Sequence, residues 1–290
     1  MFKIVKLLIV CCLVATLVNC SIVVRSRRTS RRTCGTRDKT INLSGNKSNV
    51  TRGEFPWLAS IYSIVNETKF VCGSSLISHD KVVTAAHCIQ DKNQEAARKE
   101  DEIILYFGRW NLNETHEIDS VEVGARKILI HPDWDSKDKK YYADIALIVL
   151  KSSVTYTNFI SPICLPSHRS HLNEKVGLIV GWGQRQESDE HESIPMQFEM
   201  PIVSTGVCLN NNFRQRALMT EKMICAGYKS GGFPCTGDSG GGLYVNHNNK
   251  WYLHGIISTG LVHIYDTCVN TYGLFTNVLE FSDWIENSII

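Results

Sequence analysis

One serine of the chain lies in a glycine-rich segment that suits an attacking nucleophile. The segment spans residues 235–242 and reads Cys-Thr-Gly-Asp-Ser-Gly-Gly-Gly, with Ser239 near its centre. A carbonyl under attack develops negative charge that needs backbone N–H donors close by. Glycine lets the chain turn so that the N–H groups of Gly237 and Ser239 can both point inward. The pattern predicts acyl transfer by a serine.

A serine hydroxyl is a weak nucleophile at neutral pH and needs a base, which in turn needs a carboxylate to orient it. His87 follows two alanines, which leave room for close approach, and precedes Cys88, which can fix the loop. Asp144 opens the apolar run 145–148, where a carboxylate buried without a partner would be costly. Singly, these residues fit a turn serine, a core histidine and a strand cap. Jointly, they predict a catalytic triad of His87, Asp144 and Ser239.

The elements that must position these residues are expected to be short strands. From Phe55 onward, apolar and β-branched runs alternate with turn residues, as at 57–65, 81–86, 103–107, 145–150, 176–180 and 251–258. This spacing is typical of an all-β sandwich or barrel. Near the C-terminus, Val278, Phe281, Trp284 and Ile285 recur at three- and four-residue steps. They predict an amphipathic terminal helix packed on the β core.

From about residue 53 to residue 290, the chain resembles the chymotrypsin-like serine proteases. Besides the three candidate catalytic segments, the resemblance is carried by Gly-Glu-Phe-Pro-Trp at 53–57, Pro-Ile-Cys-Leu-Pro at 162–166, Gly-Trp-Gly at 181–183 and Cys-Ala-Gly at 225–227. The resemblance implies an all-β fold of two packed six-stranded antiparallel β-barrels, with the active site between them, a C-terminal helix and acyl-enzyme chemistry. It also implies an oxyanion hole formed by the N–H groups of Gly237 and Ser239.

The same resemblance implies how substrates and partners are bound. Ser258, Thr259 and Gly260 would form a rail for the substrate backbone, and the partners would be protein or peptide substrates, an activating protease and serpin-type inhibitors. It implies neither a cofactor nor a metal. Segments 240–243 and 251–256 are similar to those of arthropod haemolymph proteases of the clotting and immune cascades, which suggests a cascade role.

The cysteines indicate disulfides rather than a zinc site. Three of the 11 cysteines fall in the first 20 residues, and eight remain. An even number in an exported chain favours four disulfides, and close C-x-x-C or H-x-x-x-H pairs are absent. The resemblance implies the pairs Cys72–Cys88, Cys208–Cys225 and Cys235–Cys268, leaving Cys34 and Cys164 to tie the leader to the catalytic domain.

The N-terminal residues indicate export. Residues 1–20 combine Lys3 and Lys6 with an apolar stretch at 7–18, which predicts a signal peptide cleaved near Cys20. The stretch is too short for a membrane anchor, which needs about 20 apolar residues. Residues 21–43 are basic and are predicted to be a leader or propeptide, either a solvated disordered stretch or a processing region, and residues 44–290 form the peptidase domain.

Two further features fit a secreted, extracellular protein that binds neither nucleic acid nor membrane. Basic and acidic residues are nearly balanced, at 31 and 29, and they are mixed along the chain. Five N-glycosylation sequons follow the predicted signal, at Asn42, Asn46, Asn49, Asn66 and Asn113.

Two positions depart from the family pattern. Family zymogens are usually activated by a cut after a basic residue, which frees an Ile-Val-Gly-Gly end whose amine pairs with the acid before the serine, here Asp238. That tetrapeptide is absent; the alignment lands on residues 44–47, or on 41–42 with a small insertion, and neither start directly follows lysine or arginine. At the floor of the specificity pocket stands Phe233, where trypsin-like members carry aspartate. We therefore expect a preference for apolar or small side chains, or a partly blocked pocket.

Two other functions compete with a protease. A catalytically silent homologue that only binds partners fits the unusual activation stretch and Phe233, although such homologues typically lose a triad residue. A lipase or esterase fits the G-x-S-x-G pattern at 237–241. That fold needs its acid and histidine after the serine, whereas the residues after Ser239 are predicted to be mostly strands, with His254 and His263 structural.

Overall fold

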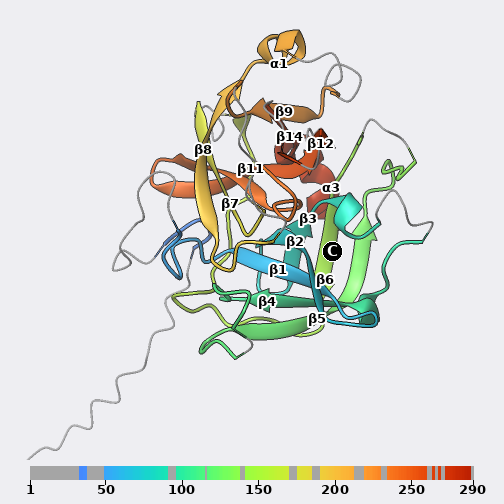
Figure 1. The fold of residues 1–290 in the computed structure, drawn as a ribbon, viewed down its shortest axis with the longest axis vertical. Helices are drawn as coiled ribbons and strands as arrows, with labels where there is room; N and C mark the ends of the chain where they lie inside the picture. Colours follow the sequence, from blue (N-terminus) through green and yellow to red (C-terminus); the bar gives the residue numbers. More distant parts are fainter. Residues whose placement is uncertain are drawn as a thin grey trace, which may run out of the picture. The chain divides into compact units, whose positions relative to one another are not determined.

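The computed structural model describes residues 33–37, 49–90, 96–114, 116–137, 141–169, 175–184, 190–211, 219–229, 234–259, 263–264, 267–268 and 272–288. Two closed six-stranded antiparallel barrels form the body of this part of the chain. In Figure 1 the strands of the first barrel, blue to green, lie below those of the second, yellow to red. The predicted fold class is confirmed.

The first barrel consists of β1 (Leu58–Ser63), β2 (Lys69–Leu76), β3 (Lys81–Thr84), β4 (Ile103–Phe107), β5 (Val121–Ile130) and β6 (Ala146–Leu150). They are hydrogen-bonded in the order β1-β2-β3-β6-β5-β4. Buried and half-buried residues alternate along β4, the pattern of a strand with one face toward a core, whereas β6 is buried throughout. Two short 3₁₀ helices, η1 (Ala86–Cys88) and η2 (Glu100–Glu102), interrupt the connections.

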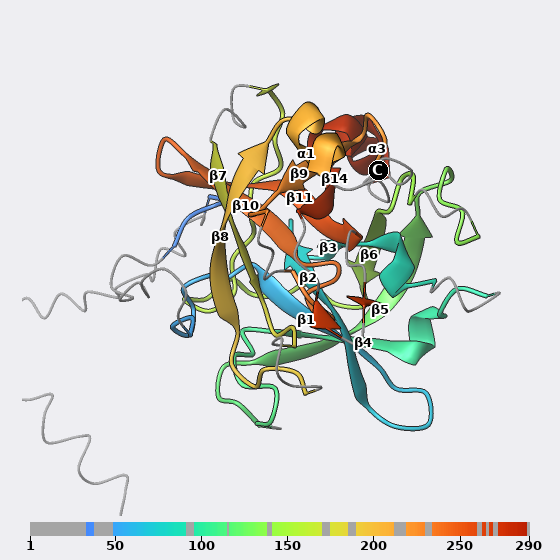
Figure 2. The ribbon, with the colours of Figure 1, turned by 45° about the horizontal axis from the view of Figure 1, so that its top comes forward.

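The second barrel consists of β7 (Val176–Gly181), β8 (Met196–Val203), β9 (Met223–Ala226), β10 (Gly242–His247), β11 (Lys250–Thr259) and β14 (Gly273–Asn277), in the order β10-β11-β14-β9-β8-β7. A helix, α1 (Thr205–Asn211), precedes β9, and a two-stranded sheet joins β12 (His263–Ile264) to β13 (Thr267–Cys268). Asn248 and Asn249 both have positive φ, which suits the tight hairpin between β10 and β11. Figure 2 shows the same strands from a second direction.

The predicted C-terminal helix is present as η4 (Val278–Phe281) followed by α3 (Ser282–Asn287). The side chain of Asn277 accepts a hydrogen bond from the backbone N–H of Leu279, which caps the first turn. Val278, Phe281 and Ile285 are buried in the same apolar cluster as the first-barrel core. The same cluster contains Leu253 and Ile256 of β11, so the helix packs on residues of both barrels.

The two barrels share one interface that fixes their relative position. The ring of Trp57 in the first barrel packs on that of Tyr244 in the second, at 5.6 Å between centroids. The Tyr244 hydroxyl also hydrogen-bonds the Ser75 Oγ at 2.8 Å, with both side chains buried. Groups carried by different barrels are thereby held in a constant geometry.

Disulfides join distant parts of this fold. Three of the expected pairs are present, Cys34–Cys164, Cys72–Cys88 and Cys208–Cys225. Cys235 is also disulfide-bonded. The side chain of its expected partner, Cys268, is not among those that the structure describes.

The described part of the predicted leader, residues 33–37, lies against the second barrel. The Gly35 N–H donates to the Pro162 carbonyl at 2.7 Å, and the Trp251 N–H donates to the Gly35 carbonyl at 3.0 Å. The boundary between leader and peptidase domain after residue 43 stays a prediction, and the predicted signal peptide lies outside the described residues.

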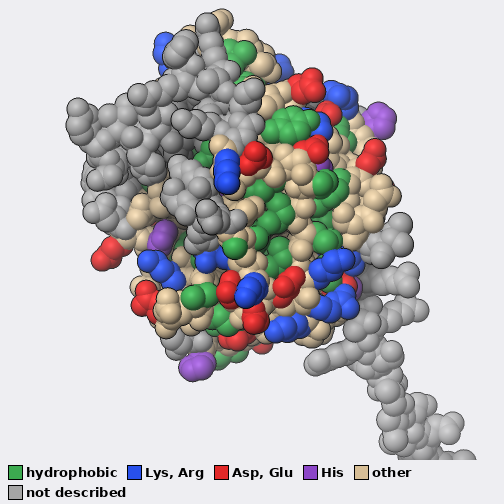
Figure 3. All heavy atoms as spheres, turned by 90° about the vertical axis from the view of Figure 1, so that its right-hand side faces the viewer, with side chains coloured by type: hydrophobic (Ala, Val, Ile, Leu, Met, Phe, Trp, Pro, Cys, Tyr) green, Lys and Arg blue, Asp and Glu red, His purple; other side chains and the backbone are tan. Residues whose placement is uncertain are grey.

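Surface charge is mixed on the face drawn in Figure 3, where basic and acidic side chains alternate. This agrees with the formal net charge of +2 at pH 7. No helix in the described ranges is long and apolar enough to cross a membrane.

Candidate active site

Asp144 and His87 form a hydrogen-bonded pair. The Asp144 Oδ2 lies 2.8 Å from the His87 Nδ1, and the Oδ1 accepts from the His87 backbone N–H at 2.9 Å. The Asp144 side chain is completely buried, while that of His87 is 18% exposed. Because a carboxylate accepts only from a protonated nitrogen, Nδ1 carries the proton and Nε2 keeps its lone pair. This leaves Nε2 able to act as a base.

Asp144 has further partners, at its carboxylate and at its backbone, that hold it in place. Ser258 Oγ donates to Oδ2, and Thr276 Oγ1 donates to the Asp144 backbone carbonyl. The Ile145 N–H donates to the Ala143 carbonyl, which turns the chain sharply at Asp144. Side chains from β11 and β14 of the second barrel thus hold Asp144, which lies just before β6 of the first barrel.

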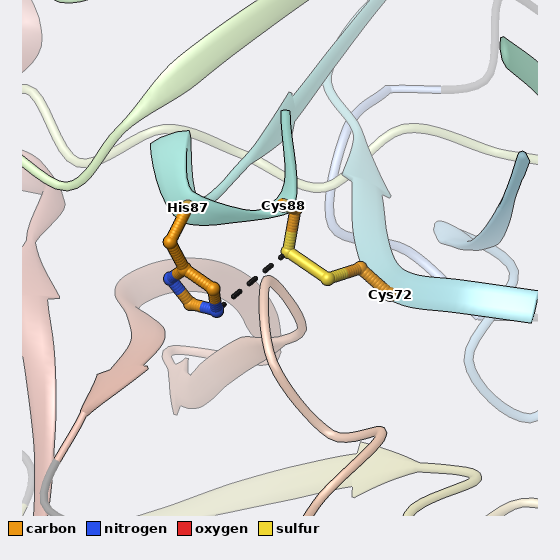
Figure 4. Close-up of side chains that lie close together, drawn as sticks. All are labelled: Cys72, His87 and Cys88. Atoms are coloured by element: carbon orange, nitrogen blue, oxygen red, sulfur yellow. Dashed lines mark hydrogen bonds between the residues drawn. A yellow bond between two sulfur atoms is a disulfide. The ribbon is translucent and has the colours of Figure 1, made fainter. Parts of the chain in front are cut away.

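His87 lies in η1, and a disulfide fixes that short helix to β2. Figure 4 shows Cys88 bonded to Cys72, with the His87 Nε2 3.9 Å from the Cys88 Sγ. Cys72, His87 and Cys88 bring three ligand-type atoms within 4.8 Å of one another. Both sulfurs are tied up in the disulfide, so neither is the thiolate that a metal needs. The cluster positions the histidine and does not form a metal site.

The turn that carries Ser239 requires glycine on both sides. Gly237 has a φ of +95° and Gly240 a φ of +74°, which side-chain-bearing residues rarely adopt. The Ser239 carbonyl accepts from the Gly73 N–H of β2, and the Gly240 N–H donates to the Ile257 carbonyl of β11. A Cβ on Gly240 would approach the Cys88 Sγ to 2.9 Å. The serine turn therefore packs directly against the loop that carries His87.

The backbone around Ser239 has the features expected of an oxyanion hole. Gly237 is buried, and Ser239 is half-buried between buried neighbours. Neither N–H group donates a hydrogen bond to any residue in the described ranges. Two unused donors beside a partly accessible hydroxyl could stabilise negative charge on a bound carbonyl oxygen.

Asp238 is a second buried carboxylate, 6% exposed. Its Oδ1 accepts from the Gly183 N–H at 2.9 Å and its Oδ2 from the Cys235 N–H at 3.0 Å. Burial raises its pKa to about 6, although the two hydrogen bonds act in the opposite direction. Among the described residues, no cation forms an ion pair with it. A cation that reached this carboxylate would be held strongly.

His191 is a neighbour of the candidate site that the sequence did not indicate. A Cβ built on Gly237 would lie 2.5 Å from the His191 Nδ1, so the imidazole covers this glycine closely. The ring also packs edge-on against Phe70, at 5.1 Å between centroids. Partial burial and the charge of Lys69 lower the His191 pKa, opposed by a hydrogen bond that the imidazole donates to the Trp182 backbone. Gly237 and His191 are brought together only by tertiary structure.

Several predicted site residues lie outside what the structure describes. Phe233, Gly260, Asn42 and Asn46 are in ranges that it does not describe, and of Thr259 only the backbone in β11 is described. The other three sequon asparagines, Asn49, Asn66 and Asn113, are exposed. The specificity pocket and the activation stretch therefore remain predictions.

Comparison with known proteins agrees with this arrangement. The family model described as Trypsin matches residues 45–285. "Serine protease gd" of Drosophila melanogaster is 34% identical over 277 residues, covering 83% of this chain and 52% of that protein. "Limulus clotting factor C" of Carcinoscorpius rotundicauda is 34% identical over 264 residues, covering 85% and 25%.

"Melanization protease 1" of Drosophila melanogaster is 33% identical over 269 residues, covering 85% of this chain and 65% of that protein. The chain spans less than two thirds of each of these three relatives. Both the matched range and the double-barrel fold agree with the resemblance inferred from the sequence. The chain belongs to the trypsin family of serine proteases.

Proposed function

We propose that this protein is a secreted serine endopeptidase that hydrolyses peptide bonds through an acyl-enzyme. The observation that carries the proposal is the contact between the Asp144 Oδ2 and the His87 Nδ1, at 2.8 Å, next to the turn that presents Ser239. This contact leaves the His87 Nε2 unprotonated, which is the state that a general base requires.

In the proposed reaction, Ser239 Oγ attacks the carbonyl carbon of the scissile peptide bond while the His87 Nε2 takes its proton. The negative charge on the carbonyl oxygen is stabilised by the N–H groups of Gly237 and Ser239, and the imidazolium is stabilised by Asp144. His87 then returns the proton to the leaving amine as the peptide bond breaks. Water then attacks the carbonyl carbon of the resulting ester while the His87 Nε2 takes its proton. His87 returns that proton to the Ser239 Oγ as the ester bond breaks, which frees the acid product and restores the enzyme.

Activation is proposed to depend on Asp238. Its buried carboxylate would gain a partner if cleavage before residue 49 freed an amino group able to reach it. Formation of such a pair would fix the adjacent residues Gly237 and Ser239, whose N–H groups form the oxyanion hole. The strong burial of Asp238, with no described cation beside it, supports this proposal.

We further propose a role in an extracellular proteolytic cascade, with protein substrates, an activating protease and serpin-type inhibitors as partners. The printed names of two relatives, a clotting factor and a melanization protease, support a cascade role by analogy. The three disulfides support an oxidising, extracellular location.

A peptide library tests this function. The protein, after limited proteolysis, is incubated with the library, and mass spectrometry identifies the cleaved bonds. We expect cleavage after apolar or small residues, because Phe233 replaces the pocket aspartate of trypsin-like members. The Ser239→Ala variant, processed identically, serves as control and should cleave nothing. Equal product patterns from both proteins, or none from either, would favour the silent homologue.

A further inference from the structure

A groove of about 470 Å³ lies beside the hairpin that connects β1 and β2. Its lining combines apolar and charged side chains, among them Val65, Glu67, Lys69, Phe70, Val71 and Arg98. No residue of the proposed catalytic machinery is among those that line it. The groove is therefore a feature separate from the triad.

The strand β2 connects this groove directly to the nucleophile. Phe70 and Val71 in the groove precede Cys72, whose disulfide to Cys88 adjoins His87. The next residue, Gly73, donates its N–H to the Ser239 carbonyl. Since a strand rises about 3.3 Å per residue, only about 10 Å of strand separate Gly73 from Phe70.

The groove begins on the leaving-group side of Ser239. The serine turn is held between two strands, by the Gly73 N–H of β2 and by the Ile257 carbonyl of β11. The expected rail for the acyl part of a substrate, Ser258 to Gly260, follows Ile257 along the β11 side. A polypeptide whose acyl part lies along β11 would leave Ser239 toward β2 and enter the groove.

An aromatic wall separates the serine turn from the groove. The Phe70 and His191 rings meet edge to face at 5.1 Å, and His191 covers Gly237. Phe70 also packs on the Trp182 ring at 6.2 Å, which fixes its position. The first residue after a scissile bond at Ser239 would therefore meet ring edges and the Val71 side chain, an apolar surface.

Farther from the serine, the described lining of the groove carries a net positive charge. Among the described residues that line it, Lys69 and Arg98 are basic and Glu67 is acidic. Arg98 is oriented by a hydrogen bond from its Nη1 to the Ser63 Oγ, at 3.3 Å. Lys69 is exposed on β2, so its ammonium group is free to turn toward a bound peptide. Two cations and one carboxylate leave an excess positive charge, which complements an acidic side chain of a bound peptide.

We propose that this groove binds the leaving-group side of polypeptide substrates and selects for an apolar residue directly after the scissile bond, followed by acidic residues. The inference rests on the proposed peptidase function and adds to it a preference on the leaving-group side. Lys69 and Arg98 are specificity-determining residues in this scheme, and neither touches the reacting atoms.

The test uses two peptide substrates with identical residues up to and including the first position after the scissile bond. The second and third positions after the bond are Asp-Asp in one peptide and Asn-Asn in the other. We expect the processed protein to have a kcat/KM about fivefold higher for the Asp-Asp peptide, since each exposed ion pair contributes modestly. In Lys69→Glu this ratio should fall to about one or below.

Two controls separate the groove from the catalytic machinery. Lys127→Glu places the same charge change on an exposed position of β5 that does not line this groove, and it should keep the fivefold ratio. A short anilide substrate, which has no residues after the scissile bond, should be hydrolysed equally by all three proteins. If the unsubstituted protein hydrolyses the anilide but shows equal kcat/KM for the Asp-Asp and Asn-Asn peptides, the groove proposal alone is overturned. Absence of hydrolysis of any substrate by the processed protein would overturn the peptidase function itself.

Discussion

At the scale of single residues, the two carboxylates of the site serve different purposes. Asp144 is completely buried with donors on both oxygens, and it fixes the tautomer of His87. Asp238 is almost as buried, but it receives only two backbone N–H groups. In the proposed mechanism, the first carboxylate acts on the reaction, whereas the second gains a cation on cleavage and so fixes the backbone next to Ser239.

Asp144→Asn is expected to lower kcat/KM for a peptide substrate by about 10⁴-fold. An amide in place of the carboxylate no longer holds the proton on the His87 Nδ1, so Nε2 loses its basic lone pair. Asp133→Asn is the matched control, because Asp133 is an exposed carboxylate beside another histidine, with its Oδ2 3.9 Å from the His131 Nδ1. It should change kcat/KM less than twofold. A loss below tenfold in Asp144→Asn would contradict the assigned role.

The raised pKa of Asp238 predicts that the uncleaved and the cleaved protein differ in stability by an amount that depends on pH. In the uncleaved protein its pKa is raised from 3.8 to about 6, so the folded state loses stability as the pH rises from about 4 through 6. At neutral pH the loss amounts to about 3 kcal/mol. In the cleaved protein an ammonium partner would keep this pKa low and remove the loss.

The measurement is urea unfolding of both forms between pH 4 and pH 7, in a Ser239→Ala background that prevents self-digestion. The stability of the cleaved form relative to the uncleaved form should increase with pH across this range. His254, whose pKa burial lowers to about 4, contributes an opposite slope in both forms, and that slope cancels in the difference. A difference that does not change with pH would show that Asp238 gains no cation on cleavage.

At the scale of elements, the serine turn depends on a close fit between the two barrels. Gly240 has positive φ, and a Cβ there would lie 2.6 Å from the Gly73 carbonyl oxygen and 2.9 Å from the Cys88 Sγ. Either the turn or the His87 loop would have to move. The geometry between Ser239 and His87 is thus a consequence of packing between β2, η1 and the turn before β10.

Gly240→Ala is therefore expected to lower kcat/KM at least 100-fold, because small displacements of catalytic groups are costly. It should also lower the free energy of unfolding by about 1–3 kcal/mol through backbone strain. Gly206→Ala is the matched control, since a Cβ at Gly206 in α1 meets nothing within 4 Å. Activity assays and urea unfolding check both effects. Full activity in Gly240→Ala would contradict the proposed packing of the turn.

Many of the strands, the serine turn and the terminal helix could be predicted from the sequence, because strand alternation and glycine-rich turns are local signals. The terminal helix, for instance, follows from the spacing of Val278, Phe281 and Ile285. Contacts between distant segments gave no such signal. Ser258 was expected only as part of a substrate rail, yet its side chain donates to Asp144. The contact of His191 with Gly237 likewise exists only because the segment between β7 and β8 meets the serine turn in the folded chain.

At the scale of the whole molecule, residues 33–37, the described part of the predicted leader, are bound to the rest of the fold by more than a disulfide. The Arg37 guanidinium lies between the rings of Phe55 and Trp251, at 4.1 and 4.0 Å from their centroids. Its Nη1 is 3.7 Å from the carboxylate of Glu54, which is itself buried. Burial lowers the Arg37 pKa to about 10. Residues 33–37 are therefore held both by the segment before β1 and by β11 of the second barrel.

Cleavage between residues 38 and 48 should leave residues 33–37 attached. Electrophoresis of cleaved Ser239→Ala protein should give one band without reductant and two bands with it, because Cys34 stays bonded to Cys164.

Arg37→Ala should lower the free energy of unfolding by about 1–3 kcal/mol, since it removes the cation–π contacts with Phe55 and Trp251 and the ion pair with the buried Glu54. Arg169→Ala, which breaks an exposed pair with Glu280, should have little effect. Equal stability of the two variants would contradict the anchoring role of Arg37.

The central claim, that Ser239 is an activated nucleophile, is tested most directly by covalent labelling with a fluorophosphonate, followed by peptide mapping. The secreted protein is treated before and after limited proteolysis, alongside Ser239→Ala. We predict a single phosphonyl adduct on the peptide that contains Ser239, formed only after cleavage and absent from the variant. Absence of an adduct from every processed form, or an adduct on another residue, would contradict the proposed triad.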